Sequence, residues 1–128
     1  MIQVFHGKTC QAVYDSENDR MLYSFKGYAV IDEHKAMYRK TMEFAKEHKV
    51  VSFIMDFRAM KGTFTFLNDW VIQTLTPAVA LGLKKGAMVL NEDIFTAFSA
   101  NDAISKVTLI QLQVFEDPEE ARHWLERP

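Results

Sequence analysis

The stretch that decides the fold is residues 50–57, which read VVSFIMDF. It is β-branched, aromatic and almost wholly apolar, and a short run of this kind is typical of a strand buried on both faces. Such strands occupy the centre of parallel sheets, where helices cover both sides. The stretch therefore predicts an α/β domain built around a mainly parallel sheet.

The segments before this strand predict a hairpin and then a helix. Residues 9–14 and 20–26 flank the turn sequence DSEND, a pattern that indicates two antiparallel strands. Over residues 33–48 apolar side chains recur with helical spacing, and Asp32 is the expected N-cap. The helix carries the chain from the hairpin to the central strand.

Immediately after the central strand, residues 58–62 (RAMKG) are expected to form a loop. Residues 66–83 are helical in composition and apolar on nearly every side. Pro77 is expected to divide this helix into two pieces, with Thr76 capping the second piece and Gly82 ending it.

The remainder of the chain continues the alternation. Residues 86–90 and 109–115 predict strands, and residues 94–107 between them predict a helix. Asp117 is the expected cap of a last helix that begins at Pro118. The predicted order is β-β-α-β-α-β-α-β-α, a mixed, mainly parallel sheet of about five strands in a single domain over residues 1–128.

Composition excludes several classes of protein. The 128 residues are 48% hydrophobic and 25% charged, with a net charge of −2. The hydrophobic fraction is too high for a disordered chain. The positive and negative charges are too nearly equal for a nucleic-acid binder, which would carry a basic excess. No apolar run reaches the roughly 18–20 residues of a membrane helix. The first residues do not follow the pattern of a secretion signal, and the single Cys10 suits a reducing cytoplasm. We therefore expect a cytoplasmic protein.

Motifs of catalysis or cofactor binding do not stand out in the sequence. The four histidines lack the spacing of a zinc site, the five glycines are scattered, and no serine lies in a nucleophile-elbow motif. We expect no cofactor, no metal and no enzyme activity.

Asp56 is the charged residue with the strongest claim to a role, because it interrupts the central strand near its carboxyl end. Folds of the α/β class place ligand sites at the carboxyl ends of their strands, so Asp56 and Arg58 are candidates to contact a ligand or partner. The alternative is structural: Asp56 accepts backbone N–H groups of the next loop, or pairs with Arg58 or Lys61.

The element order and four local stretches resemble the STAS / SpoIIAA-like family, and more narrowly its small stand-alone bacterial STAS/CRAL-TRIO-like proteins. The resemblance covers roughly residues 10–126. It rests on VVSFIMDFR at 50–58, GLKKGAMVLNEDIF at 82–95, FSANDAISK at 98–106 and VFEDPEEARHWLE at 114–126. It implies a SpoIIAA-like mixed sheet with helices, often in a dimer, without recorded enzyme chemistry.

The same resemblance raises the question of a phosphorylation switch. STAS domains that act as anti-sigma antagonists carry an Asp-Ser pair at the start of the helix after the central strand, and that serine is phosphorylated. No such pair occurs here, and Thr63 and Thr65 are the hydroxyl residues in the matching region. Either threonine is a candidate phosphate acceptor at a helix N-terminus, or simply an N-cap.

The apolar helix of residues 66–83 is the second candidate for function. A helix that is apolar all round is either buried or covered by a partner, so Phe66, Trp70 and Val71 are candidates for a homodimer interface, with Trp70 as the anchor. The alternatives are burial within the monomer and a lipid-lined groove.

The predicted function is a non-enzymatic interaction or regulatory module, homodimeric and acting on another regulatory protein. A lipid or apolar-ligand binder is the alternative, and a small enzyme has the least support.

Overall fold

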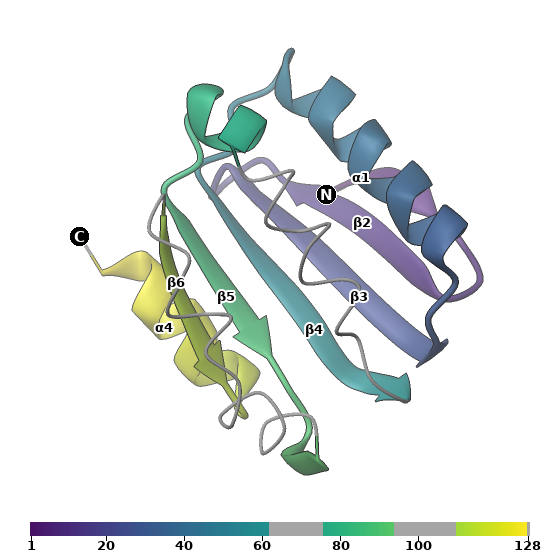
Figure 1. The fold of residues 1–128 in the computed structure, drawn as a ribbon. Coiled ribbons are helices and arrows are strands. Elements are labelled where there is room, and N and C mark those ends of the chain that lie inside the picture. Colours follow the sequence, from purple (N-terminus) through teal and green to yellow (C-terminus); the bar gives the residue numbers. More distant parts are fainter. Residues whose placement is uncertain (62–75, 94–109, 128) are drawn as a thin grey trace.

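The computed structural model of the protein describes residues 1–61, 76–93 and 110–127. Six strands in these residues form one sheet in chain order (Figure 1). The first three pair antiparallel, and the third to sixth pair parallel. The strands are β1 (Ile2–His6), β2 (Cys10–Asp15), β3 (Arg20–Tyr28), β4 (Ser52–Lys61), β5 (Lys85–Val89) and β6 (Gln111–Phe115). The predicted mixed, mainly parallel α/β sheet is confirmed, with one strand more than expected.

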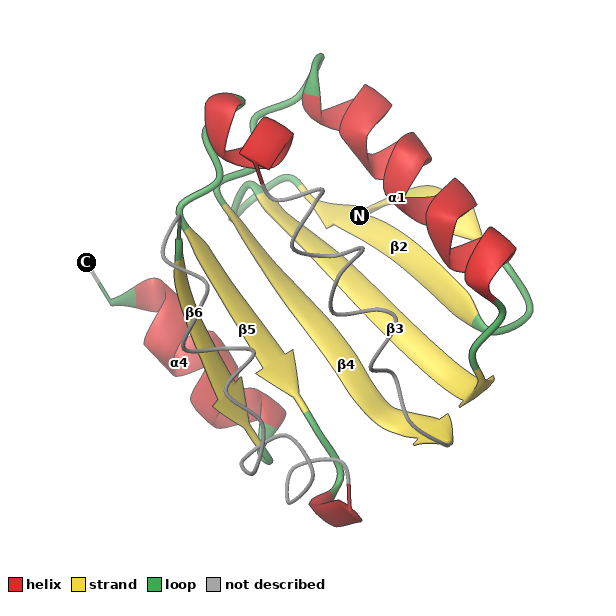
Figure 2. Cartoon of the chain, in the orientation of Figure 1, coloured by secondary structure: helices red, strands yellow, loops and turns green. Residues whose placement is uncertain are grey.

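Helices lie on both faces of the sheet, as the helices and strands in Figure 2 show. On one face α1 (Ile31–Ala45) buries Met37 and Tyr38 in the larger core, against aromatic and methionine side chains of β2, β3 and β4. On the opposite face α4 (Pro118–Glu126) buries Ala121 and Leu125 in a smaller core. The central strand β4 contributes alternate side chains to the two cores, which explains its continuous apolar sequence.

The described helices cover only part of the width of the α4 face. Helix α4 contacts β4, β5 and β6, whereas α1 contacts β1 and β2 from the other side. In Figure 1, α4 accordingly lies behind the β5–β6 end of the sheet. Of the helices that the structure describes, none covers β1, β2 and β3 on the α4 face, and we call this area the open half.

Two segments form strands that the sequence did not predict. One had been left unassigned, and the other had been predicted as a loop. Residues 2–6 form β1 as an edge strand, although the sequence suggested no strand there. The predicted loop at 58–62 is wrong up to Lys61, because β4 continues pairing with β3 beyond an irregularity near Asp56. Asn91 holds this extension by donating from Nδ2 to the backbone oxygen of Arg58 at 3.2 Å. Strand pairing, which depends on distant residues, creates both strands.

The ends of the helices test the predicted capping residues. Asp32 is not the N-cap of α1: the helix begins at Ile31 after Val30, which makes no side-chain cap bond, and ends at Ala45. Asp117 is the predicted cap of α4, and its Oδ1 accepts from the backbone N of Glu119 at 3.0 Å. The Asp32 prediction fails because nearby Val30 supplies the extended conformation that precedes the helix.

Of the residues predicted as a helix before β5, the structure describes 76–83. Residues 76–80 are helical, so Thr76 lies within the helix and is not its cap. Gly82 has a φ of 113° and ends the helix as predicted: its N–H donates to Val79, and the N–H of Leu83 donates to Ala78. This paired arrangement is a Schellman motif, which favours glycine. The predicted helix at 94–107 lies outside the described residues.

His34 in α1 makes the stability of the fold dependent on pH. Its side chain is 1% exposed, and neither ring nitrogen has a hydrogen-bond partner in the part of the chain that the structure describes. Burial lowers its pKa, an effect that the charge of Glu33 only partly offsets. Because the folded state resists protonation, stability is full above the unfolded value of about 6.5 and falls as the pH drops below it.

We expect wild-type protein to lose about 1 kcal/mol of unfolding free energy between pH 8 and pH 5.5, and His34→Leu to lose much less. Urea unfolding at the two pH values measures both losses. His123→Leu, on the exposed part of α4, is the control and should keep the wild-type dependence. Equal pH dependence in wild type and His34→Leu would contradict the assignment.

Candidate functional site

A row of directly paired residues crosses the whole sheet and defines the candidate site. The pairings join His6 to Gln11, Gln11 to Ser24, Ser24 to Asp56, Asp56 to Val89 and Val89 to Phe115. Paired residues point to the same face, here the face of α4. The row is polar on β1 to β4 and apolar on β5 and β6, where α4 covers it. The polar part therefore lies on the open half.

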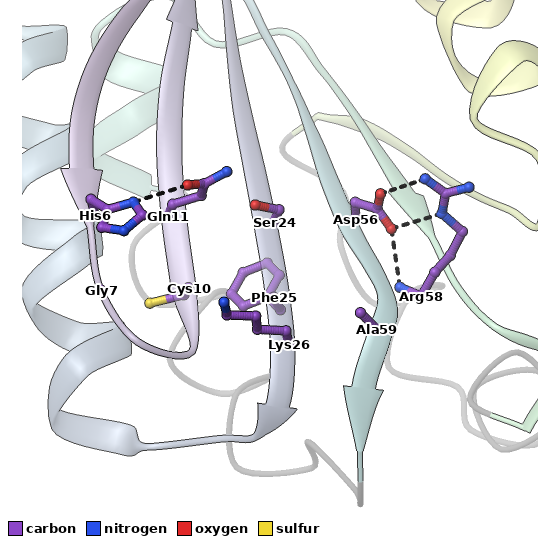
Figure 3. Close-up of a pocket in the computed structure, with 10 residues that line it drawn as sticks. All are labelled: His6, Gly7, Cys10, Gln11, Ser24, Phe25, Lys26, Asp56, Arg58 and Ala59. Carbon is purple, nitrogen blue, oxygen red and sulfur yellow. Dashed lines mark hydrogen bonds and ion pairs between the residues drawn. The ribbon is translucent and has the colours of Figure 1, made fainter.

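A groove with a cavity volume of about 470 Å³ lies along this polar part. Its lining residues come from β1, β2, β3 and β4 and from the loop after β1. Figure 3 shows the ion-paired residues of β4 on one side and the imidazole of β1 on the other. Its polar lining consists of His6, Gln11, Ser24, Lys26, Asp56 and Arg58. The groove lies on the sheet face beside the middle and the second half of β3 and β4. Asp56 is therefore in the middle of β4 and not near the carboxyl end of a strand, because β4 continues to Lys61.

Asp56 and Arg58 form an ion pair inside one strand. Arg58 donates from Nη2 to Oδ2 of Asp56 at 2.7 Å, and from Nε to Oδ1 at 3.0 Å. The backbone N of Arg58 also donates to Oδ1 at 3.0 Å. Burial raises the pKa of Asp56, but these bonds outweigh it and the pKa is lowered. The pair has the geometry of the predicted structural alternative, and it lines the groove as well.

The other side of the groove is built by His6 and Gln11. Nδ1 of His6 lies 3.1 Å from Oε1 of Gln11, and because an amide oxygen only accepts, Nδ1 is the donor. Within the described residues, the amide nitrogen of Gln11 makes no hydrogen bond and can donate to a further acceptor. Ser24 and Lys26 of β3 lie between the two sides (Figure 3), and their side chains make no hydrogen bond or ion pair with each other.

The loop at the end of the groove is held by Glu33 of α1, a contact that the sequence analysis missed. Oε1 of Glu33 accepts from the backbone N of Thr9 at 2.6 Å, from its hydroxyl at 2.8 Å and from the backbone N of Cys10 at 3.2 Å. A side chain on Gly7 would overlap this carboxylate. Although burial raises the pKa of Glu33, these hydrogen bonds lower it overall.

Cys10 contacts the same carboxylate, and its thiol is unreactive. Its side chain is 3% exposed, and Sγ donates to Oε1 of Glu33 at 3.6 Å. Burial, followed by the charge of Glu33, raises the pKa of the thiol to about 12. The thiol is therefore protonated at neutral pH, and a protonated thiol is a poor nucleophile.

The other predicted site residues all lie outside the described residues. These are the candidate phosphate acceptors Thr63 and Thr65 and the candidate interface residues Phe66, Trp70 and Val71. The apolar stretch of residues 66–83 enters the description at residue 76. None of the described helices is long and apolar enough to cross a membrane.

At the described end of that stretch, apolar side chains remain exposed. Leu81 is 39% exposed, and Pro77 and Ala80 are exposed as well. Leu81 also borders an apolar hollow of about 40 Å³ that α1 lines with Met42 and Ala45. This apolar surface lies on the α1 side of the sheet, away from the groove.

Comparison with solved structures identifies the fold. The chain is similar to the crystal structure of an uncharacterized protein of the DUF3478 family from Shewanella loihica PV-4, which has a SpoIIAA-like fold. The TM-score is 0.66, the sequences are 13% identical, and the match covers 94% of this chain and 97% of the other. No family model and no curated protein sequence matches the chain significantly. The chain therefore has the SpoIIAA-like fold that its local stretches predicted.

Proposed function

We propose that the protein is a non-enzymatic interaction module of the STAS-like type, which forms a homodimer and regulates a partner protein. The observation that carries the proposal is the exposed apolar end of the 66–83 stretch, at Pro77, Ala80 and Leu81. A helix that is apolar on every side needs a second surface to cover it. Its described end leaves apolar groups in water, which favours coverage by a second copy over burial within the monomer.

The nature of the hollow beside Leu81 supports a protein partner. Its volume of about 40 Å³ is far below the roughly 300 Å³ at which ligand pockets begin. An exposed apolar surface with only a small hollow suits side chains of a facing protein better than an acyl chain. This favours the interaction module over the lipid binder.

The hydrogen bonds of Asp56 and Glu33 and the protonated thiol of Cys10 support a non-enzymatic role. Both carboxylate oxygens of Asp56 accept hydrogen bonds from Arg58, and Oε1 of Glu33 accepts bonds from Thr9 and Cys10. General bases and nucleophiles need a free lone pair near the substrate. These side chains are instead committed to holding strands and loops.

The test compares two arginine substitutions at exposed apolar residues. Leu81→Arg places a charge in the proposed interface, and Tyr28→Arg places one at the 71% exposed last residue of β3. We expect Leu81→Arg to raise the dimer dissociation constant at least tenfold, a loss of about 1.4 kcal/mol. Sedimentation velocity over a concentration series measures it.

Tyr28→Arg should dimerise like the wild type. Trp70→Ala is the second variant, and it should also weaken the dimer if Trp70 is the anchor. Equal dissociation constants for Leu81→Arg, Trp70→Ala and wild type would overturn the proposed interface.

A further inference from the structure

We propose that the groove on the open half of the sheet binds a small anionic metabolite, through a phosphate or carboxylate group held by Lys26 and Arg58. The inference goes beyond the proposed homodimer. The groove lies on the face of α4, whereas the apolar surface around Leu81 lies on the face of α1. The two proposals can therefore succeed or fail separately.

The place of the groove in the fold favours a ligand site. A paired row from His6 through Gln11 and Ser24 to Asp56 runs across four strands, and α4 leaves this part of the row uncovered. A fully packed face would be apolar here, as it is at Val89 and Phe115 in the same row. The volume of about 470 Å³ lies within the range of small-molecule pockets.

The hydrogen-bonding groups in the groove are mainly donors. Oε1 of Gln11 accepts from His6, which leaves its amide nitrogen to donate elsewhere. Arg58 uses Nε and Nη2 on Asp56, so the hydrogens on Nη1 remain for another acceptor. Lys26 presents an ammonium group, and Ser24 a hydroxyl. A ligand that accepts several hydrogen bonds at one point is complementary to this set.

The charge of the lining side chains also favours an anion. Among the described lining residues Asp56 is the one acid, and the guanidinium of Arg58 neutralises it through two hydrogen bonds. Lys26 then adds a positive charge that no described lining carboxylate pairs with, while the carboxylates of Glu33, at the end of the groove, and of Asp117, near Arg58, lie outside the lining. Phosphate and carboxylate groups are the anions whose oxygens match an arginine edge and a lysine ammonium. The ion pair with Asp56 also fixes the guanidinium, so binding an anion requires little ordering of Arg58.

The test uses three probes with the same three-carbon body: glycerol 3-phosphate, glycerate and glycerol. Each is titrated into uniformly labelled protein at constant ionic strength, and amide chemical shifts are followed by NMR. We expect shifts at β2, β3 and β4 residues around the groove with glycerol 3-phosphate or glycerate, and none with glycerol. Binding of only one of the two anions identifies phosphate or carboxylate as the preferred group.

Two charge variants test the assigned residues. Lys26→Gln should weaken binding of the anionic probe about tenfold, because it removes a charge-assisted hydrogen bond. Lys46→Gln, at an exposed lysine just after α1, removes the same charge elsewhere and should leave binding unchanged. Ala59→Glu adds a carboxylate to the groove without removing any group and should abolish binding.

Three results would overturn the proposal. The first is no shift at the groove with either anion up to about 10 mM. The second is an equal response to glycerol, which would show that charge plays no part. The third is equal weakening by Lys26→Gln and Lys46→Gln. A monomeric protein that still binds the anions would refute the homodimer and leave this inference standing.

Discussion

Replacing Gly86 by alanine is expected to destabilise the protein by about 3 kcal/mol. Gly86 in β5 pairs directly with Phe53 in β4, and a methyl group at this position would overlap the Phe53 ring. The ring is 4% exposed and packs in the larger core, and the hollow of about 40 Å³ that it borders is too small to take a displaced ring. Over-packing of this kind forces strained rotamers or a shift of the strand.

The double variant Gly86→Ala/Phe53→Leu separates this overlap from other effects of the alanine. A smaller side chain at residue 53 removes the ring that the methyl group meets. We therefore expect Gly86→Ala to cost at least about 1 kcal/mol less in the Phe53→Leu background than in the wild type. Urea unfolding of the four proteins measures this coupling, and a coupling near zero would show that the overlap is relieved without cost.

Glu33→Ala is expected to lower the free energy of unfolding by about 2 kcal/mol. Glu33 is the acceptor for the backbone N–H groups of Thr9 and Cys10 and for the Thr9 hydroxyl. Its removal leaves part-buried donors of the β1–β2 loop without this acceptor, and such donors are costly. Partial exposure of the side chain keeps the effect moderate. Glu47→Ala, at an exposed residue after α1, is the control and should change little.

The dependence on pH identifies the carboxylate as the cause. The pKa of Glu33 is lowered in the folded protein, so its contribution is present above the unfolded value of about 4.3. It is lost as the pH falls through the lower folded value. Unfolding measured at pH 7 and at pH 3 should therefore show a smaller difference between wild type and Glu33→Ala in acid. A difference that is constant with pH would contradict the role of the charge.

The sequence predicted correctly those elements that depend on residues adjacent in the chain. The run at 50–57 predicted the central strand because its apolar side chains enter cores on both faces of β4. Gly82 and Asp117 predicted helix ends because a left-handed residue and a capping carboxylate act on their immediate neighbours. By contrast, β1 and the end of β4 are strands because of pairing with β2 and β3, which no local pattern records.

The candidate site was predictable in part for the same reason. The sequence identified Asp56 on the central strand and Arg58 beside it, and both line the groove, although β4 continues past them to Lys61. His6, Gln11 and Ser24 join them through the register of four strands, which is set by long-range pairing. The contact of Glu33 with the β1–β2 loop spans 24 residues of sequence. The glycine at 7 and an acid in the first turn of α1 are signals consistent with that contact.

The most direct test of the proposed homodimer is the mass of the wild-type protein in solution. Sedimentation equilibrium over concentrations from about 1 μM to 1 mM covers the range of dissociation constants expected for such an interface. We predict a mass that rises with concentration to twice the 14.8 kDa of one chain. A mass of 14.8 kDa at every concentration would contradict the homodimer and the interface around Leu81.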